Sequence, residues 1–186
     1  MLNKSVLALR WLADLDARLF LGLNRLHSYI RLEKPVRFIS ATGDGYLYVL
    51  MGVLVPLLAP HSGVLFLKLM LIAFLLELPI YWALKHSFKR RRPFRVVQAL
   101  APLLKPSDEF SFPSGHTTAA FMVATITAAL FPAAAIIMYP WAALVGLSRV
   151  MLKVHFVSDV LAGVALGVTL ALLSLAIMSG YSGASF

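Results

Sequence analysis

The side chains best suited to chemistry in this sequence gather in three short segments. The first runs from Lys85 to Pro93 and places Lys85 and Arg92 seven positions apart. That spacing is about two helical turns, so both cations can point the same way if a helix continues to Arg92, where Pro93 is expected to end it. Basic residues beside an apolar stretch are also typical of a plain membrane anchor. We assign that anchoring role to three neighbours: Lys89, Arg90 and Arg91.

The second segment is Pro113-Ser114-Gly115-His116. Proline is favoured at the start of a helix, because its missing N–H would lack a helical partner there in any case. The backbone N–H groups of Ser114 and Gly115 would then point out of a helix N-terminus, which suits an anion. Gly115 permits close approach, and His116 lies in the same first turn. The alternative is simple helix capping, with His116 at the membrane interface.

The third segment begins with Ser148-Arg149 and ends with His155 and Asp159. Four positions separate His155 from Asp159, which makes them neighbours on one helical face. The carboxylate can accept a hydrogen bond from one imidazole nitrogen and leave the other nitrogen free to attack. Asp159 is also the only charged residue of its apolar stretch, and such a residue indicates function. The alternative is a local His–Asp pair at a helix start.

Together the three segments supply three cations, a helix N-terminus, two histidines and one carboxylate. This set suits the binding of a phosphate group and its attack by nitrogen. A metal site is not expected, because the neighbouring arginines and lysine disfavour a cation. The chain has no cysteine, which excludes thiolate metal sites and a cysteine nucleophile.

The composition places these segments in a membrane protein. Hydrophobic residues make up 60% of the 186 residues, charged residues make up 13%, and the mean hydropathy is +0.84. A soluble domain of this size has too little interior for so much apolar surface. The net charge of +9 therefore favours anionic lipid headgroups or a phosphorylated substrate as partners, and not nucleic acid.

Long stretches with few charges predict an all-α fold, a polytopic membrane helix bundle in one domain, residues 1–186. Because about 20 apolar residues cross a bilayer, we expect about five transmembrane helices within 36–180: 45–59, 63–84, 114–131, 133–150 and 157–179. The first is short and can reach back toward Val36 past Gly43-Asp44-Gly45. Residues 1–35 predict an interfacial amphipathic segment, with apolar residues at helical spacing: Leu12, Leu15, Leu19, Leu23 and Leu26.

Five crossings would bring all three chemical segments to one face of the membrane. The opposite face would carry only short neutral loops and the C-terminal tail. Sixteen of the seventeen Lys and Arg residues fall on the first face or at helix ends beside it. By the positive-inside rule, this charge distribution favours a cytoplasmic site.

The three segments, in this order, resemble the motifs of the type 2 phosphatidic acid phosphatase superfamily of integral membrane lipid phosphatases. Lys85 to Pro93 has the form KxxxxxxRP, residues 113–116 read PSGH, and Ser148 to Asp159 has the form SRxxxxxHxxxD. No motif position departs from the pattern. The layout, with an amphipathic segment in place of a first span, is similar to that of short bacterial undecaprenyl-diphosphate phosphatases.

The resemblance implies a role for each residue. His155 would be the nucleophile that forms a phosphohistidine, Asp159 would orient it, and His116 would protonate the leaving oxygen and then activate water. The phosphoryl oxygens would be held by five residues: Lys85, Arg92, Ser114, Gly115 and Arg149. No metal or other cofactor would be needed. The resemblance also implies a bacterial inner membrane, with the site on its outer side. This location is opposite to the cytoplasmic one that the distribution of Lys and Arg favours.

Several readings stay open at this point. The substrate could be phosphatidylglycerophosphate, phosphatidate, or a polyprenyl phosphate or diphosphate. Glu77 and Lys68, both charged within an apolar stretch, leave room for a transporter, and a catalytically inactive lipid-binding protein is a third class. We expect lipid entry along Phe94 to Phe112, with an apolar run lying on the membrane: Val96, Val97, Leu100, Leu103 and Leu104.

Overall fold

A computed structural model of the chain describes residues 4–30, 33–97, 102–106 and 108–182, which form helices and turns with no strand among them. The helices are α1 (Lys4–Ile30), α2 (Glu33–Thr42), α3 (Gly45–Leu58), α4 (Pro60–Phe88), α5 (Pro93–Val96), α6 (Gly115–Leu130), the 3₁₀ turn η1 (Pro132–Ala134), α7 (Ala135–Met151) and α8 (Val157–Ser182). The predicted all-α class is confirmed.

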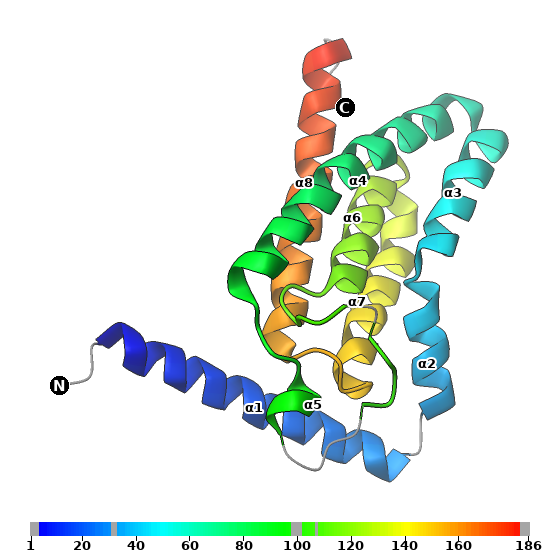
Figure 1. The fold of residues 1–186 in the computed structure, drawn as a ribbon. Coiled ribbons are helices and arrows are strands. Elements are labelled where there is room, and N and C mark those ends of the chain that lie inside the picture. The colour runs from blue at the N-terminus through cyan, green and yellow to red at the C-terminus, as the bar shows by residue number, and fades with distance from the viewer. Residues whose placement is uncertain (1–3, 31–32, 98–101, 107, 183–186) are drawn as a thin grey trace.

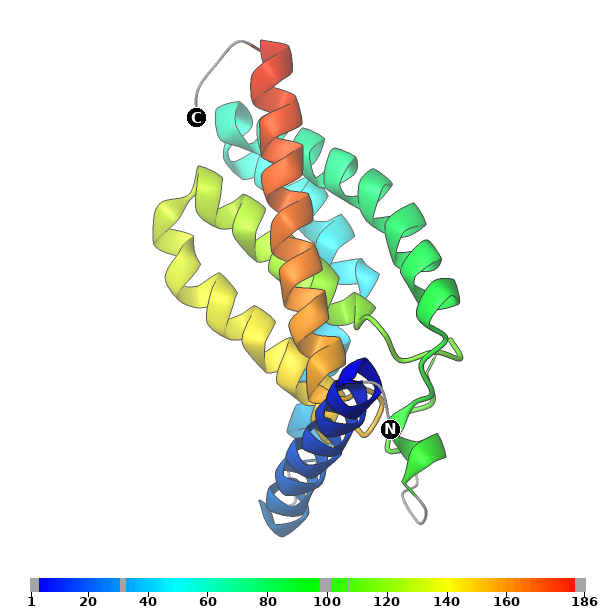
Figure 2. The same cartoon turned by 90° about the vertical axis from the view of Figure 1, so that its left-hand side faces the viewer.

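The helices form an elongated bundle with one helix laid across its end. In Figures 1 and 2, α3, α4, α6, α7 and α8 run along the bundle, and α1 crosses its lower end. The turn between α3 and α4, η1 and the C-terminal end of α8 lie at the opposite end (Figure 1). The basic segments in and around α1, α2 and α5 therefore share one end of the molecule.

Among the described residues, three to four membrane spans can be counted. The segments 60–96, 132–151 and 157–180 are each long and apolar enough to cross a membrane, and α2 with α3 passes the same test only as a pair bent by 49°. α6 is apolar but has only 16 residues, fewer than the roughly 20 that cross a bilayer. The chain is an integral membrane protein, and the expected count of about five spans is not confirmed.

The break between α2 and α3 lies at Gly43 and Asp44. A Cβ atom at Gly43 would lie 2.7 Å from Val145 Cγ1, so a side chain at this position would require α7 to shift. The next residue, Asp44, has an extended backbone and precedes the first turn of α3. The expected span 45–59 is thus the second half of a bent pair that begins at Glu33.

The outward faces of the bundle are apolar. Large side chains such as Leu57, Leu75 and Leu161 are exposed on α3, α4 and α8. A continuous surface of this kind is rare on soluble monomers and fits contact with lipid tails.

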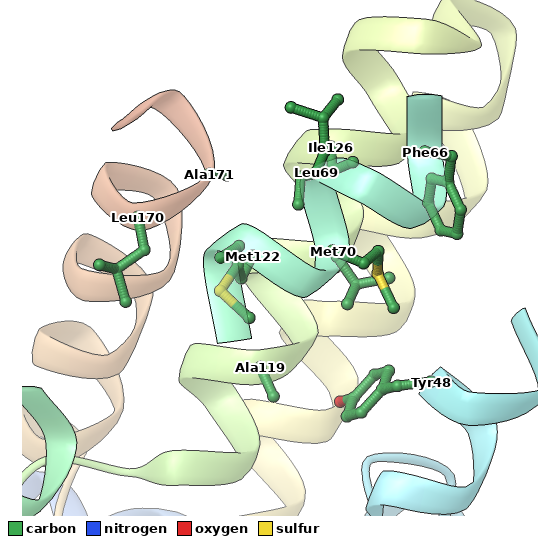
Figure 3. Packing of buried hydrophobic residues seen from close by; sticks show 11 residues of the cluster. Tyr48, Phe66, Leu69, Met70, Ala119, Met122, Ile126, Leu170 and Ala171 are labelled. Carbon is green, nitrogen blue, oxygen red and sulfur yellow. The ribbon is translucent and has the colours of Figure 1, made fainter. Parts of the chain in front are cut away.

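The interior is closed by side chains from four helices (Figure 3). Tyr48 of α3, Phe66 and Met70 of α4, Met122 of α6 and Leu170 of α8 belong to one buried cluster. Because lipid tails are as apolar as these side chains, helices within a bilayer are held together by close packing and not by removal from water.

α6 and α8 pack most closely, and this contact positions the site. A Cβ atom at Gly167 would lie 2.3 Å from the Thr118 carbonyl oxygen, and one at Gly163 would lie 2.8 Å from the Ser114 carbonyl oxygen. Glycines four residues apart on one helix allow this backbone approach. As a result the N-terminal ends of α6 and α8 lie side by side, and the Ser114 N–H donates to the Asp159 carbonyl oxygen at 3.0 Å.

α1 has an outward apolar face and an inward face of mixed chemistry. Leu15 and Leu19 are exposed, as an interfacial helix requires, whereas Asp16, Phe20 and Asn24 are buried. The buried residues are spaced by four and form one stripe toward the bundle. The predicted amphipathic segment is thus helical, although the side chains of Leu12 and Leu26 lie outside the described residues.

Candidate active site

The three predicted segments meet at the end of the bundle where α1 lies. Lys85 is in the last turn of α4, His116 is in the first turn of α6, and Arg149 is in the last turn of α7. His155 lies in the turn between α7 and α8, and Asp159 is in the first turn of α8. Of the eight predicted site residues, five charged or titratable ones are buried and lie in one cluster: Lys85, Arg92, Arg149, His155 and Asp159.

Lys85 and Arg92 converge on a shared partner instead of a shared helical face. α4 ends at Phe88, and Lys89 follows in the left-handed region with φ 45°. The expected continuation of the helix to Arg92 is therefore wrong, since Pro93 starts the short helix α5. The two cations meet because the chain reverses between them.

Their shared partner is Asp108, which the motif pattern does not include. Its Oδ1 lies 2.6 Å from Lys85 Nζ and 2.5 Å from Arg92 Nη2, and Tyr81 Oη donates to its Oδ2 at 3.0 Å. Burial by itself raises the pKa of Asp108, but hydrogen bonding and charge from Lys85, with Arg92, hold that pKa below its ordinary value. A carboxylate thus occupies the two cations expected to hold phosphoryl oxygens.

His155 is buried beside Asp159, but the two are not neighbours on a helical face. α8 begins at Val157, so His155 precedes it, and His155 Nδ1 lies 3.6 Å from Asp159 Oδ2. That distance allows charge attraction but exceeds a hydrogen bond. Burial lowers the pKa of His155 to about 4, against the raising effect of Asp159. The imidazole is neutral at neutral pH, and its Nε2 faces Arg92 Nη1 at 3.4 Å.

Arg90 is not the solvated anchor expected from the basic run. Its Nη1 donates to Asp159 Oδ1 at 2.7 Å, and its Nη2 donates to Asp16 Oδ2 at 2.6 Å. Its neighbour Arg91 is exposed, in keeping with the anchor prediction. The reason for the difference is the turn after Phe88, which directs Arg90 inward.

The second histidine has a carboxylate partner from a distant part of the chain. His116 Nε2 lies 2.7 Å from Asp44 Oδ1, across 72 sequence positions. Asp44 stands at the break between α2 and α3. The sequence signal was the Gly43-Asp44-Gly45 break itself, which we interpreted only as an interruption of a span.

Ser114 and Gly115 differ from the expected anion site. The Ser114 N–H is taken by the Asp159 carbonyl oxygen, and its hydroxyl pairs with Thr117 Oγ1 at 2.8 Å. The expectation of a free N–H at Ser114 is therefore wrong, because α8 packs against this helix end. Gly115 begins α6, and a Cβ atom there would approach the Tyr81 ring at 3.0 Å.

Arg149 keeps unused hydrogen-bonding capacity. Its Nη1 donates to Ser40 Oγ at 2.5 Å, whereas its buried Nε has no partner among the described residues. Ser40 lies on α2, a segment to which the sequence assigned no site residue. An unpaired guanidinium N–H next to a histidine suits an incoming oxyanion.

Two adjoining hollows connect the charged end to the bundle side. One, of about 300 Å³, is lined by the polar residues Asp44, Glu77, Tyr81, Asp108 and His116. The other, of about 500 Å³, is an apolar groove between α3 and α4. They share four lining residues and so form one continuous path: Gly45, Tyr48, Phe74 and Leu78.

The expected lipid-entry segment is arranged differently. Leu103 and Leu104 are half-buried and pack against the buried Val36, Leu152 and Val154. Val96 is exposed, and Leu100 lies outside the described residues. The groove that reaches His116 is formed by α3 and α4, because these two helices diverge on the side of Glu77.

Among the described residues, no group of three or more His, Asp and Glu side chains is placed to hold a metal ion. Asp108 and Asp159 are instead paired with Lys85, Arg90 and Arg92.

Two histidine–carboxylate pairs and a cation cluster at one end of a helical membrane bundle form an arrangement that can hold a phosphoryl group beside a nitrogen nucleophile. Residues 63–181 match the PAP2 superfamily, and the chain belongs to that superfamily.

Relatives and a solved structure support this membership. The chain is 36% identical over 95 residues to a lipid A 1-phosphatase of Rhizobium johnstonii, covering 49% of this chain and 39% of the relative. It is 39% identical over 113 residues to phosphatidylglycerophosphatase B of Bacillus subtilis, covering 55% and 53%. The chain thus spans about half or less of these relatives. The crystal structure of LpxE from Aquifex aeolicus matches with a TM-score of 0.74 at 26% identity, covering 86% of this chain and 93% of that one.

Proposed function

We propose that this protein is a membrane lipid-phosphate phosphatase that works through a phosphohistidine at His155 and needs no metal. One observation carries the proposal. A buried, neutral histidine faces a cationic cluster, and a polar hollow that continues an apolar groove on the bundle side reaches Asp108 and His116 at the same end. The cations suit a phosphate, and the groove suits an acyl or prenyl chain.

In the first step His155 Nε2 attacks phosphorus, and the bond from phosphorus to the lipid oxygen breaks. His116 donates a proton to that oxygen, so a phosphomonoester leaves as the lipid alcohol and a diphosphate leaves as the lipid monophosphate. Asp159 stabilises the positive charge that develops on the His155 ring. Asp44, at 2.7 Å from His116 Nε2, stabilises the protonated form of His116 before transfer.

In the second step His116 takes a proton from water, and the resulting hydroxide attacks the phosphohistidine. The bond between phosphorus and His155 Nε2 breaks, which releases inorganic phosphate and returns a neutral imidazole. Lys85, Arg92 and Arg149 counter the charge on the equatorial oxygens in both steps. A bound phosphate replaces the Asp108 carboxylate on Lys85 and Arg92.

The substrate class follows from the path to the site. We assign a lipid with a terminal phosphate or diphosphate: phosphatidylglycerophosphate, phosphatidate, or a polyprenyl phosphate or diphosphate. The names of the two relatives, a lipid A 1-phosphatase and a phosphatidylglycerophosphatase, add a lipid A-type phosphate to the panel worth testing.

Purified protein in detergent micelles, offered each of these lipids, tests the proposal by release of inorganic phosphate. His155→Ala is the control, and wild-type protein quenched during turnover should carry acid-labile phosphate. Activity should persist in EDTA. No phosphate release from any lipid, or full activity of His155→Ala, would refute the proposal.

We place the protein in a bacterial inner membrane, with the charge count favouring a cytoplasmic site. The C-terminal end of α8 lies at the opposite end of the bundle from the site (Figure 1). Because the chain has no cysteine, Ser182→Cys gives one labelling position. Reaction with a membrane-impermeant thiol reagent on intact spheroplasts would place the site inside, and protection until permeabilisation would place it outside.

A further inference from the structure

The carboxylate of Asp159 is held mainly by groups other than His155. Its Oδ2 accepts the Phe156 backbone N–H at 2.9 Å, and its Oδ1 accepts Arg90 Nη1 at 2.7 Å. His155 Nδ1 is farther away, at 3.6 Å, and is buried without a hydrogen-bond partner among the described residues. The position of the Asp159 carboxylate relative to the imidazole is therefore set by the Phe156 N–H and Arg90, and not by His155.

Arg90 is itself held by several contacts. Its Nη1 also donates to Ser158 Oγ at 2.5 Å, and its Nη2 donates to Asp16 Oδ2 at 2.6 Å. The guanidinium carbon stands 4.4 Å from the centre of the Phe156 ring. This network differs from that of Arg92, whose Nη1 reaches toward His155 Nε2, the attacking atom.

Asp16 connects the network to α1. Besides Arg90, it accepts the Ser158 backbone N–H at 3.1 Å and the Ser158 hydroxyl at 2.5 Å. It is 5% exposed, so its charge depends on these donors and on Arg90. A buried carboxylate with both oxygens engaged is a firm support for an arginine.

The rest of the inward stripe of α1 contacts the same turn. Phe20 packs edge-on against Phe156 with ring centres 5.5 Å apart, and Asn24 donates to the Val150 carbonyl oxygen at 3.2 Å. α1 thus contacts both ends of the segment from Val150 to Ser158, which carries His155.

We infer that Arg90 is a positioning residue for the nucleophile, and that Asp16 makes the interfacial helix α1 part of the catalytic machinery. The inference rests on the proposed function. The order of contact is Asp16 to Arg90, Arg90 to Asp159, and Asp159 to His155. Arg90 orients the carboxylate that faces His155 Nδ1, and it touches neither His155 nor the atoms expected to react.

The kinetic consequence separates Arg90 from the phosphate-holding cations. Loss of Arg90 lets Asp159 shift relative to His155, and a misplacement of about 1 Å costs about 10²-fold in rate. We expect kcat to fall by about that factor while KM changes little. Arg90→Lys keeps the charge but not the two-pronged contact, so it should retain an intermediate rate. Asp16→Asn should resemble Arg90→Lys.

The experiment compares Arg90→Ala, Arg90→Lys and Asp16→Asn with Arg91→Ala, an exposed neighbour that keeps the size of the change. Steady-state kinetics give kcat and KM, and rapid quenching gives the rate at which acid-labile phosphate forms. Free guanidinium ion, added below denaturing concentration, should restore part of the activity of Arg90→Ala but none of that of His155→Ala. Arg91→Ala should match the wild type.

A second readout does not depend on turnover. Three charged groups face His155, namely Arg92, Arg149 and Asp159, and Arg90 acts on it through Asp159. Removal of Arg90 leaves the Asp159 charge less compensated, so the pKa of His155 should rise. Nuclear magnetic resonance of ¹⁵N-histidine-labelled protein, with His155→Ala for assignment, measures this shift in wild type and Arg90→Ala.

Each outcome decides the inference. A lower kcat with unchanged KM, guanidinium rescue and a raised pKa of His155 support it. An Arg90→Ala variant as active as Arg91→Ala overturns it, as does a slow variant with no rescue and an unmoved pKa, which would indicate a purely structural role. A wild type without phosphatase activity would instead refute the proposed function, and the His155 titration would still report the coupling.

Discussion

The two histidines of the site are both paired with carboxylates, yet their surroundings differ. His155 has a side chain that is 3% exposed and a partner four residues away at 3.6 Å. His116 is 26% exposed, and its partner Asp44 is 45% exposed and 2.7 Å away, at the break between α2 and α3. One pair is sealed under α1 and fixed by Arg90, whereas the other opens to the hollow beside Glu77.

This difference fits a division of labour. A nucleophile gains from a dry, rigid setting that keeps its nitrogen unprotonated. A group that gives and takes protons gains from access to water and from a partner that stabilises its charged form. In the proposed mechanism, proton exchange is assigned to the His116 side and bond formation to the His155 side.

The largest effects should come from replacing each histidine and comparing the variants with substrates whose leaving groups differ. His155→Ala should abolish turnover and the acid-labile phosphate for every substrate. His116→Ala should still form the phosphoenzyme from p-nitrophenyl phosphate, whose leaving group needs no proton, and should accumulate it because water is no longer activated. Rapid quenching with both variants measures this, and a His116→Ala variant that forms no phosphoenzyme would break the assignment.

The cations should rank by what they touch. Arg92→Ala and Arg149→Ala should each lower kcat by about 10²–10³-fold, because they meet charge that grows in the transition state. Lys89→Ala and Arg91→Ala are matched controls from the same basic run and should stay near wild-type activity. Similar mild losses in Arg92→Ala, Lys89→Ala and Arg91→Ala would favour the anchor role for the whole run.

The pH dependence should reflect the sealed pair. The pKa of His155 lies below its ordinary value, at about 4, so the imidazole loses its nucleophilic form only as pH falls through that value. We expect the acid limb of kcat/KM, corrected for ionisation of the free substrate, to lie well below the ordinary imidazole value of about 6.5. An acid limb near the ordinary imidazole value would show that His155 is not desolvated in the working enzyme.

Asp44→Asn should have a smaller effect on the open pair. The amide keeps the size of the side chain but no longer stabilises protonated His116, so kcat should fall about tenfold. The loss should be greater for a lipid alcohol than for p-nitrophenyl phosphate as leaving group. Equal losses with both substrates would mean that Asp44 acts only on the fold of the α2–α3 break.

The smallest effect concerns Asp108, which occupies Lys85 and Arg92. Its lowered pKa keeps it charged at every pH above its ordinary range, so a phosphate or vanadate must displace it. Asp108→Asn should therefore tighten vanadate inhibition a few-fold, measured as an inhibition constant at constant ionic strength. Glu109→Gln, next in the chain and paired with the exposed Arg95, is the matched control. Weaker inhibition in Asp108→Asn would mean that Asp108 helps to organise the clamp.

The sequence by itself determined which residues form the motifs, the membrane setting and the gathering of the motifs at one end. These features depend on residue type, on short spacings and on hydrophobic stretches, all of which are local properties. The same local reasoning placed the end of α4 at Arg92 and assigned Arg90 to the membrane anchor. Both predictions were wrong because the left-handed turn at Lys89 produces no recognisable pattern in the sequence.

Only the tertiary structure decided the partners of the motif residues. Asp44 reaches His116 across 72 positions, and Asp16 reaches Arg90 across 74. Asp108 reaches Lys85 because the intervening chain folds back on α4. A charged side chain carries no local signal of the buried partner it will meet, since that partner is set by the helix breaks and close helix contacts that bring distant segments together. The motif residues could therefore be identified from the sequence. The groups that form hydrogen bonds and ion pairs with them depend on the packing of α1, α2 and α8.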